Sequence, residues 1–220
     1  MLLSVTTDYA TDSGCPEPAL RRIAEAGFTH IHWCHHWSSD FVYSHAEVDQ
    51  ILRWMKGFGL KLTDLHGSIG PEKNWGSPRE YERLAGVELV LNRIEMTAWL
   101  GGDVVIMHLP AGCPEGDEEA WTRFRRSMDA LEPYASIHAV RIAIENGGSD
   151  ASFDAIERVF GMYGPEFVGL CYDSGHGNLF PGGLDRLAKL ADRLISVHLH
   201  DNQGTGDDHN LPFSGTVDWE

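Results

Sequence analysis

The chain has 220 residues, which is enough for one sizeable hydrophobic core and slightly short of the about 250 residues of a complete (β/α)8 barrel. Its 42% hydrophobic and 23% charged residues are ordinary for a globular domain. With 33 acidic and 17 basic residues the formal net charge is -16, and a field of that sign disfavours broad contact with nucleic acid.

The cysteines and the N-terminal residues indicate a compartment. Four widely spaced cysteines form no CxxC pair, so the sequence suggests neither a disulfide framework nor a zinc finger, and free thiols fit a reducing cytoplasm. The opening MLLSVTTDYATD lacks the basic segment and the apolar core of a signal peptide. No run approaches the about 20 apolar residues of a membrane span. We therefore expect a cytoplasmic protein without membrane contact.

Seven apolar runs rich in β-branched residues are the predicted strands. They are SVTTD at 4–8, HIHWCHH at 30–36, LTDLHG at 62–67, VVIMHLP at 104–110, IAIEN at 142–146, VGLCYDSGH at 168–176 and ISVHLHDN at 195–202.

Amphipathic segments between these runs predict six helices. The first follows Pro16 and stops at Gly27, and the second begins at Ser44 with a capping-box Glu47. Ser77 is the predicted cap of the third helix, which ends at Gly101. The others cover about 117–138, 150–163 and 183–193.

This alternation of strand and helix predicts a parallel α/β sheet in one domain over residues 1–220. A doubly wound sheet would bind its ligand with two or three strands at one switch point. Here six of the seven runs carry His, Asp or Glu at or near their C-terminal tip, and a closed ring brings six tips together. We therefore predict a (β/α)8 TIM barrel. Its eighth strand is missing from the sequence, which stops at VDWE, so we expect a C-terminally short chain or an open barrel.

Carboxylates at two strand tips are the strongest candidates for chemistry. Glu145 follows the apolar RIAI, where an unpaired carboxylate facing the core is costly, although a salt bridge to Arg141 is the alternative. Asp173 and His176 form a D-x-x-H within DSGHGN, and the alternative for Asp173 is a cap of the next turn.

Histidines supply the remaining candidates. His198 and His200 alternate along one strand and share a face, and we favour His198 as a metal ligand with His200 as its neighbour. Asp207 and His209 form a D-x-H in a Gly-rich segment, which alternatively is a flexible polar loop. His66 and His108 lie just beyond their apolar runs and alternatively are core histidines. His35 and His36 are at even odds between function and packing. His30, His32, His45 and His138 are predicted to be structural or on the surface.

The donor types predict the metal. Glu, Asp and His without Cys suit a borderline divalent cation, namely Mn, Co or Zn, and Mg less readily. The sequence contains no phosphate-binding glycine loop and no GxSxG elbow, so nucleotide-loop and serine-nucleophile chemistry are not indicated.

With Glu145, DSGH at 173–176, HLHDN at 198–202 and GDDHNLPFSGTVDW at 206–219, the chain resembles the xylose isomerase-like TIM-barrel superfamily over essentially its whole length. That superfamily holds sugar and sugar-phosphate isomerases and epimerases together with the endonuclease IV type of abasic-site nuclease.

For the isomerases and epimerases, the resemblance implies one metal held by Glu145, Asp173 and His198, with a fourth ligand, a Glu of the eighth strand, beyond the end of the sequence. It further implies that Glu145 exchanges protons with the substrate and that His176 contacts substrate oxygens. For endonuclease IV, with three zincs, the matching positions are His66, His108, Glu145, Asp173, His176, His198, Asp207 and His209. One departure is Ser214, where the superfamily's tail commonly has a Glu.

The primary hypothesis is a divalent-metal-dependent sugar or sugar-phosphate isomerase or epimerase that works by proton transfer through a metal-bound enediolate. A small-molecule sugar is the expected partner, nucleic acid is not, and a homo-oligomer is an expectation at the level of the family. The alternatives are an endonuclease IV-like zinc phosphodiesterase acting on abasic DNA and a non-catalytic barrel remnant.

Overall fold

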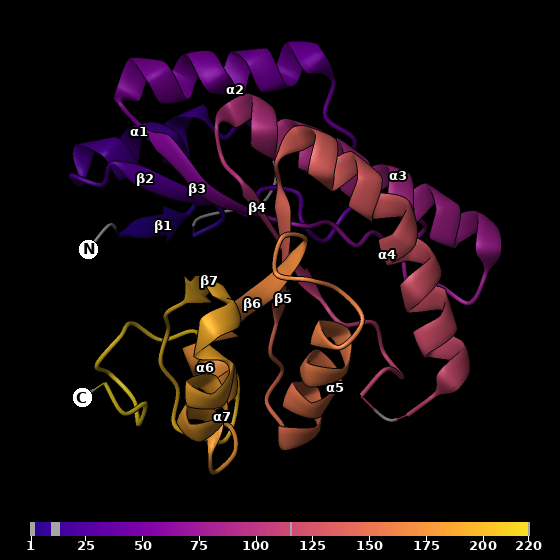
Figure 1. The fold of residues 1–220 in the computed structure, drawn as a ribbon. Coiled ribbons are helices and arrows are strands. Elements are labelled where there is room, and N and C mark those ends of the chain that lie inside the picture. The colour runs from indigo at the N-terminus through magenta and orange to yellow at the C-terminus, as the bar shows by residue number, and fades with distance from the viewer. Residues whose placement is uncertain (1–2, 10–13, 115, 220) are drawn as a thin grey trace. The chain divides into compact units, whose positions relative to one another are not determined.

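A computed structural model describes residues 3–9, 14–114 and 116–219 (Figure 1). Each of the seven predicted strands is confirmed, and the described residues form one seven-stranded sheet in chain order. The strands are β1 (Ser4–Thr6), β2 (His30–Trp33), β3 (Lys61–His66), β4 (Val104–His108), β5 (Arg141–Glu145), β6 (Val168–Asp173) and β7 (Leu194–His198).

Strand order distinguishes the predicted barrel from its alternative, a doubly wound sheet. β1, β2 and β3 pair in parallel, as do β5, β6 and β7. A doubly wound sheet requires one reversal of strand order, and this sheet has none. The doubly wound alternative is therefore excluded, and the α/β barrel class is confirmed.

The helices follow the predicted segments. They are α1 (Glu17–Glu25), α2 (His45–Phe58), α3 (Glu80–Leu100), α4 (Glu118–His138), α5 (Asp150–Phe160), α6 (Ser174–Gly177) and α7 (Gly183–Leu190), followed by a 3-10 turn (Ala191–Arg193). Side-chain caps at Ser44, Ser149 and Asp173 begin α2, α5 and α6. The predicted capping box of α2 is present: Ser44 accepts from the backbone N–H of Glu47, and the Glu47 carboxylate accepts from the backbone N–H of Ser44.

One local prediction was wrong, and one short helix was not predicted. Ser77 does not cap α3, which begins at Glu80 with Arg79 as its cap residue. The Ser77 hydroxyl instead accepts from the backbone N–H of Arg79 and donates to the carboxylate of Glu82. The short helix α6 was not predicted as an element, although a cap of the next turn was the alternative stated for Asp173, and the structure contains that cap. The helix forms because the Asp173 carboxylate accepts the backbone N–H of His176 and so begins a helical turn within DSGH.

The chain divides into two compact units, each with its own buried side chains. Unit 1 comprises Met1–Val105 and Thr122–Arg141, and unit 2 comprises Ile106–Trp121 and Ile142–Glu220. In unit 1, α1 and α2 pack together over a core that includes Leu20, Ile31 and Met55 (Figure 1). In unit 2, fully buried side chains of β5, α5 and β6 form the apolar interior. No helix among the described residues is both long and apolar enough to cross a bilayer.

The C-terminal residue of each strand is the feature that matters for chemistry. β3, β4, β5, β6 and β7 end on His66, His108, Glu145, Asp173 and His198, respectively. His66 and His108 were expected beyond their apolar runs and are in fact the last strand residues. Because parallel strands present their carboxyl ends at one edge, the tips of β4 to β7 place four predicted site residues together in unit 2.

Candidate metal centre

Glu145 lies at the centre of the cluster in unit 2. Its side chain is buried, and its Oε1 atom lies 3.2 Å from Nδ1 of His198 and 3.5 Å from Nδ1 of His176. Its Oε2 atom lies 3.5 Å from Nε2 of His108. The tips of β4, β5 and β7 and the turn of α6 therefore meet around one carboxylate.

Asp173 is the second buried carboxylate of this cluster. Its Oδ2 atom lies 2.9 Å from Nε2 of His200 and 3.8 Å from Nδ1 of His198. Its Oδ1 atom accepts the backbone N–H of His176 at 2.7 Å. His198 and His200 thus approach the same carboxylate, as their alternation along the chain predicts.

His176 has an oxygen against each ring nitrogen. Nδ1 lies 2.8 Å from the backbone oxygen of Asn146, and Nε2 lies 3.2 Å from Oδ2 of Asp207. Burial opposes protonation of His176, but the charges of Asp173, Glu145 and Asp207 outweigh it and raise its pKa. The pKa of His200 is also raised, because its hydrogen bond with Asp173 and the nearby carboxylates outweigh burial.

Asp207 and His209 extend the cluster outward. Ligand atoms of His200, Asp207 and His209 all lie within 4.8 Å of one another. Nε2 of His209 is 3.5 Å from Oδ2 of Asp207, and the His209 side chain is 65% exposed. The predicted D-x-H therefore forms an outer group of donors beside the inner one.

Asp201 holds the C-terminal segment that follows β7 and carries this outer group. The Asp201 carboxylate accepts the backbone N–H groups of Asn202 and Val217 and the indole N–H of Trp219. Burial opposes ionisation of Asp201, yet these hydrogen bonds outweigh it and lower its pKa to about 2. Sequence reasoning missed this role, although Asp201 directly follows the H-x-H pattern.

His66 lies in unit 1, at the end of β3. It is buried, its Nδ1 lies 3.0 Å from the backbone oxygen of Gly67, and its ring lies 4.7 Å from that of Trp37. In the same unit His32 is buried, with Nδ1 2.7 Å from Oδ1 of Asp64 and Nε2 3.2 Å from Sγ of Cys34. Sequence reasoning placed His32 among structural or surface histidines and did not find this pair.

His35 and His36 both pack against local partners in unit 1. His35 is buried, and its Nε2 lies 2.9 Å from the backbone oxygen of Gly14. His36 adopts a left-handed φ of 62° and stacks on Phe41 with ring centroids 4.4 Å apart. Both rings have local partners in unit 1, which favours the packing interpretation.

The donor chemistry of unit 2 fits a divalent cation. Besides the outer group, two groups of ligand atoms in unit 2 have all members within 4.8 Å of one another: Glu145, Asp173 and His176, and Glu145, Cys171 and His198. Oxygen and imidazole donors predominate, as borderline cations require. Cys171 was not predicted, and it lies beneath the cluster because it pairs in register with Glu145 and shares a face with Asp173.

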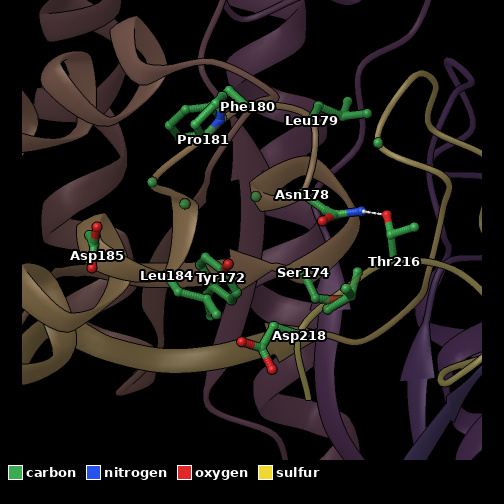
Figure 2. Close-up of a pocket in the computed structure, with 15 residues that line it drawn as sticks. Tyr172, Ser174, Asn178, Leu179, Phe180, Pro181, Leu184, Asp185, Thr216 and Asp218 are labelled. Atoms are coloured by element: carbon green, nitrogen blue, oxygen red, sulfur yellow. Dashed lines mark hydrogen bonds between the residues drawn. The ribbon is translucent and has the colours of Figure 1, made fainter. Parts of the chain in front are cut away.

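A cavity of about 490 Å³ lies beside this cluster in unit 2 (Figure 2). Tyr172 and Ser174, which flank Asp173 in the chain, line it together with the loop after α6. Asn178 donates to the hydroxyl of Thr216 across its rim. None of the predicted ligands lines this cavity, so it is separate from the donor cluster.

Ser214, the departure noted in the tail, is exposed. Its hydroxyl donates to the backbone oxygen of Leu211, a contact within its own turn.

Residues 20–220 match the model of a family described as xylose isomerase-like TIM barrel. The uncharacterised protein y4fM of Sinorhizobium fredii is 34% identical over 229 residues, which cover 92% of this chain and 74% of that protein. A probable endonuclease 4 of Mycobacterium ulcerans is 24% identical over 156 residues. These cover 67% of this chain and 62% of the endonuclease, so the chain spans less than two thirds of that relative.

Solved structures with the same fold include two epimerases or epimerase-like proteins. A D-tagatose 3-epimerase-like protein superposes with a TM-score of 0.81 at 19% identity, covering 99% of this chain and 82% of the other. A 3-keto-D-glucoside 4-epimerase of E. coli superposes with a TM-score of 0.77 at 18% identity, covering 99% and 84%. At these identities the likeness concerns the fold.

Proposed function

The chain belongs to the xylose isomerase-like TIM barrel family, and from that premise we propose that it is a divalent-metal-dependent isomerase or epimerase of a sugar or sugar phosphate. The observation that carries the proposal is the meeting of Glu145, Asp173 and His198 at adjacent strand tips. The fold shared with sugar epimerases supports the same substrate class.

Glu145, Asp173 and His198 would hold the cation. Manganese, cobalt or zinc suits these donors better than magnesium. When bound, such a cation polarises a substrate carbonyl and makes the neighbouring C–H more acidic.

The chain's own groups would move the proton. Glu145 is buried among imidazoles, and its carboxylate would remove the proton from the carbon next to the carbonyl or return it. His176 would contact a substrate oxygen through Nε2, because its Nδ1 already faces the backbone oxygen of Asn146. His108, with Nε2 against Glu145, would serve as a further contact to substrate oxygens.

A second candidate is a zinc phosphodiesterase acting on abasic DNA. The outer donors His200, Asp207 and His209 favour it, because they offer room for more than one metal ion. The net charge of -16 counts against it, since a nuclease must hold a polyanion. The endonuclease 4 relatives match at 24% identity, which keeps this candidate second.

The test combines metal content with activity. We expect natively purified protein to contain about one manganese, cobalt or zinc ion per chain by mass spectrometry and to epimerise or isomerise a member of a ketose panel. Glu145→Gln should lower that activity by about 100-fold or more, because the variant keeps the shape of the site and removes the base. Glu157→Gln, on the surface of α5, is the matched control and should keep full activity.

Two outcomes would overturn this proposal. One is full activity in a folded Glu145→Gln variant. The other is about three zinc ions per chain together with cleavage of abasic duplex DNA, which would establish the second candidate instead.

A further inference from the structure

Asn146 is fully buried and directly follows Glu145 at the tip of β5. Its side chain makes two hydrogen bonds to the main chain of Asp173. Oδ1 accepts the Asp173 backbone N–H at 2.8 Å, and Nδ2 donates to the Asp173 backbone oxygen at 3.1 Å. Both main-chain groups of Asp173 are thereby held by one neighbouring amide, which fixes the direction in which its carboxylate leaves the strand.

The main chain of Asn146 acts on a second site residue. Its carbonyl oxygen lies 2.8 Å from Nδ1 of His176, and oxygens of Glu145 and Asp173 lie 3.5 Å and 3.7 Å from the same nitrogen. Three oxygen acceptors around Nδ1 require a proton on that nitrogen. Nε2, on the opposite side of the ring, faces Oδ2 of Asp207 at 3.2 Å, and in the neutral ring, which carries one proton, the three oxygens around Nδ1 place that proton on Nδ1.

We propose that Asn146 is the positioning residue of this centre: its carbonyl holds the Nδ1–H tautomer of His176, and its amide side chain orients Asp173. The role rests on the proposed function, because orienting these two side chains matters only if they bind a metal ion or substrate. Asn146 itself acts through these two residues and touches neither metal ion nor substrate. An amide serves here because it donates and accepts at once, whereas a carboxylate in its place would have no proton to donate to the Asp173 carbonyl.

The first measurement is the affinity for Mn²⁺, by calorimetric titration of metal-stripped protein. Asn146→Ala should bind Mn²⁺ about 10- to 100-fold more weakly than the parent, as is typical when a group that orients a ligand is removed. Asn178→Ala is the matched control, since Asn178 lies in the same unit and its side chain bonds Asn202 and Thr216 instead of the donor cluster. The control should lose thermal stability and keep the parent's affinity within about twofold.

The second measurement is made on the unsubstituted, metal-free protein and does not depend on any variant folding. Nitrogen-15 NMR of the histidine rings at alkaline pH, where the rings are neutral, should show the His176 proton on Nδ1. Asn146→Ala removes the side-chain amide but keeps the main-chain carbonyl, so this variant, like Asn178→Ala, should keep the proton on Nδ1.

The outcomes separate this inference from the proposed function. If the parent binds no Mn²⁺, Co²⁺ or Zn²⁺, the proposed function fails, and the NMR measurement alone decides whether the His176 proton lies on Nδ1, against the Asn146 carbonyl. If the parent binds metal and Asn146→Ala binds it equally well, the positioning role is wrong while the proposed function stands. A parent His176 that carries its proton on Nε2 overturns the inference in either case.

Discussion

His32 and Asp64 show how strongly a single buried pair is determined by the fold. The two lie on neighbouring strands of unit 1, and the register shift after Ile31 places His32 directly opposite Asp64. Burial opposes the charged form of His32, but Cys34 and Asp64 outweigh it and raise the pKa of His32 well above its usual range. A site residue such as Glu145 is visible as an acid at the end of an apolar run, whereas this pair joins positions 32 residues apart.

This pair predicts a pH dependence of stability in unit 1. Because folding raises the pKa of His32, its contribution is complete below the unfolded value of about 6.5 and is lost as pH rises through the folded value. The unfolding free energy should therefore fall between about pH 6.5 and the alkaline range, and His32→Gln should remove up to about 1.4 kcal/mol per pH unit of that slope. Urea unfolding of the parent and the variant at a series of pH values measures this slope.

His45→Gln serves as the control for that series. The His45 side chain is 68% exposed, and its substitution should leave the slope unchanged. An unchanged slope in His32→Gln would mean that the buried pair is not charged in the folded protein.

Two glycines inside helices show that tertiary packing decides whether a glycine position in a helix tolerates a side chain. Gly57 in α2 is exposed, and a methyl group added there would meet nothing within 4 Å. Gly86 in α3 is buried, and a methyl group there would lie 2.1 Å from the backbone nitrogen of Trp75. Helix propensity alone treats the two positions alike, so only the packing of the segment at Trp75 distinguishes them.

We expect opposite effects from the same substitution at these positions. Gly57→Ala should raise the unfolding free energy by about 0.5 to 1 kcal/mol, because alanine loses less backbone entropy than glycine in a helix. Gly86→Ala should lower it by about 1 to 3 kcal/mol, because main-chain atoms of residue 75 must move. Denaturant unfolding of both variants checks this, and equal stabilisation by both would show that the close approach at Gly86 is wrong.

The elements themselves were predicted well where the signal is local. The capping box of Ser44 and Glu47 and the seven apolar runs depend on neighbours in sequence, and the structure contains all of them. The error at Ser77 has a local cause, since its hydroxyl accepts the backbone N–H of Arg79 and donates to the carboxylate of Glu82 in the first turn, and the helix begins three residues later, at Glu80. The turn of α6 escaped prediction because glycines at 175 and 177 disfavour a helix that the Asp173 cap nevertheless starts.

For the whole molecule, we expect metal binding to raise the stability of the folded state. If the donors of unit 2 bind a cation in the folded state and not in the unfolded chain, added Mn²⁺ should raise the melting temperature. The stabilisation should be about 2.7 kcal/mol at 100 times the dissociation constant. A chelator should reverse the rise, and Asp173→Asn should abolish most of it. Thermal unfolding followed by circular dichroism measures each case, and an equal rise in parent and variant would place the metal elsewhere.

What the sequence by itself determined is the pattern of strands and helices and the identity of the polar residues at the strand tips. These follow from local chemistry. Continuous apolar runs separated by amphipathic helices specify parallel strands. Glu145, Asp173, His176 and His198 stand out because they are charged or imidazole groups at the ends of those runs. The tertiary structure alone decided that the carboxylate shared by His198 and His200 is that of Asp173, and it alone decided the hydrogen bonds of Asn146 and Asp201. These depend on register between strands and on the exact reach of side chains across space, and neither is encoded by residue spacing along one chain.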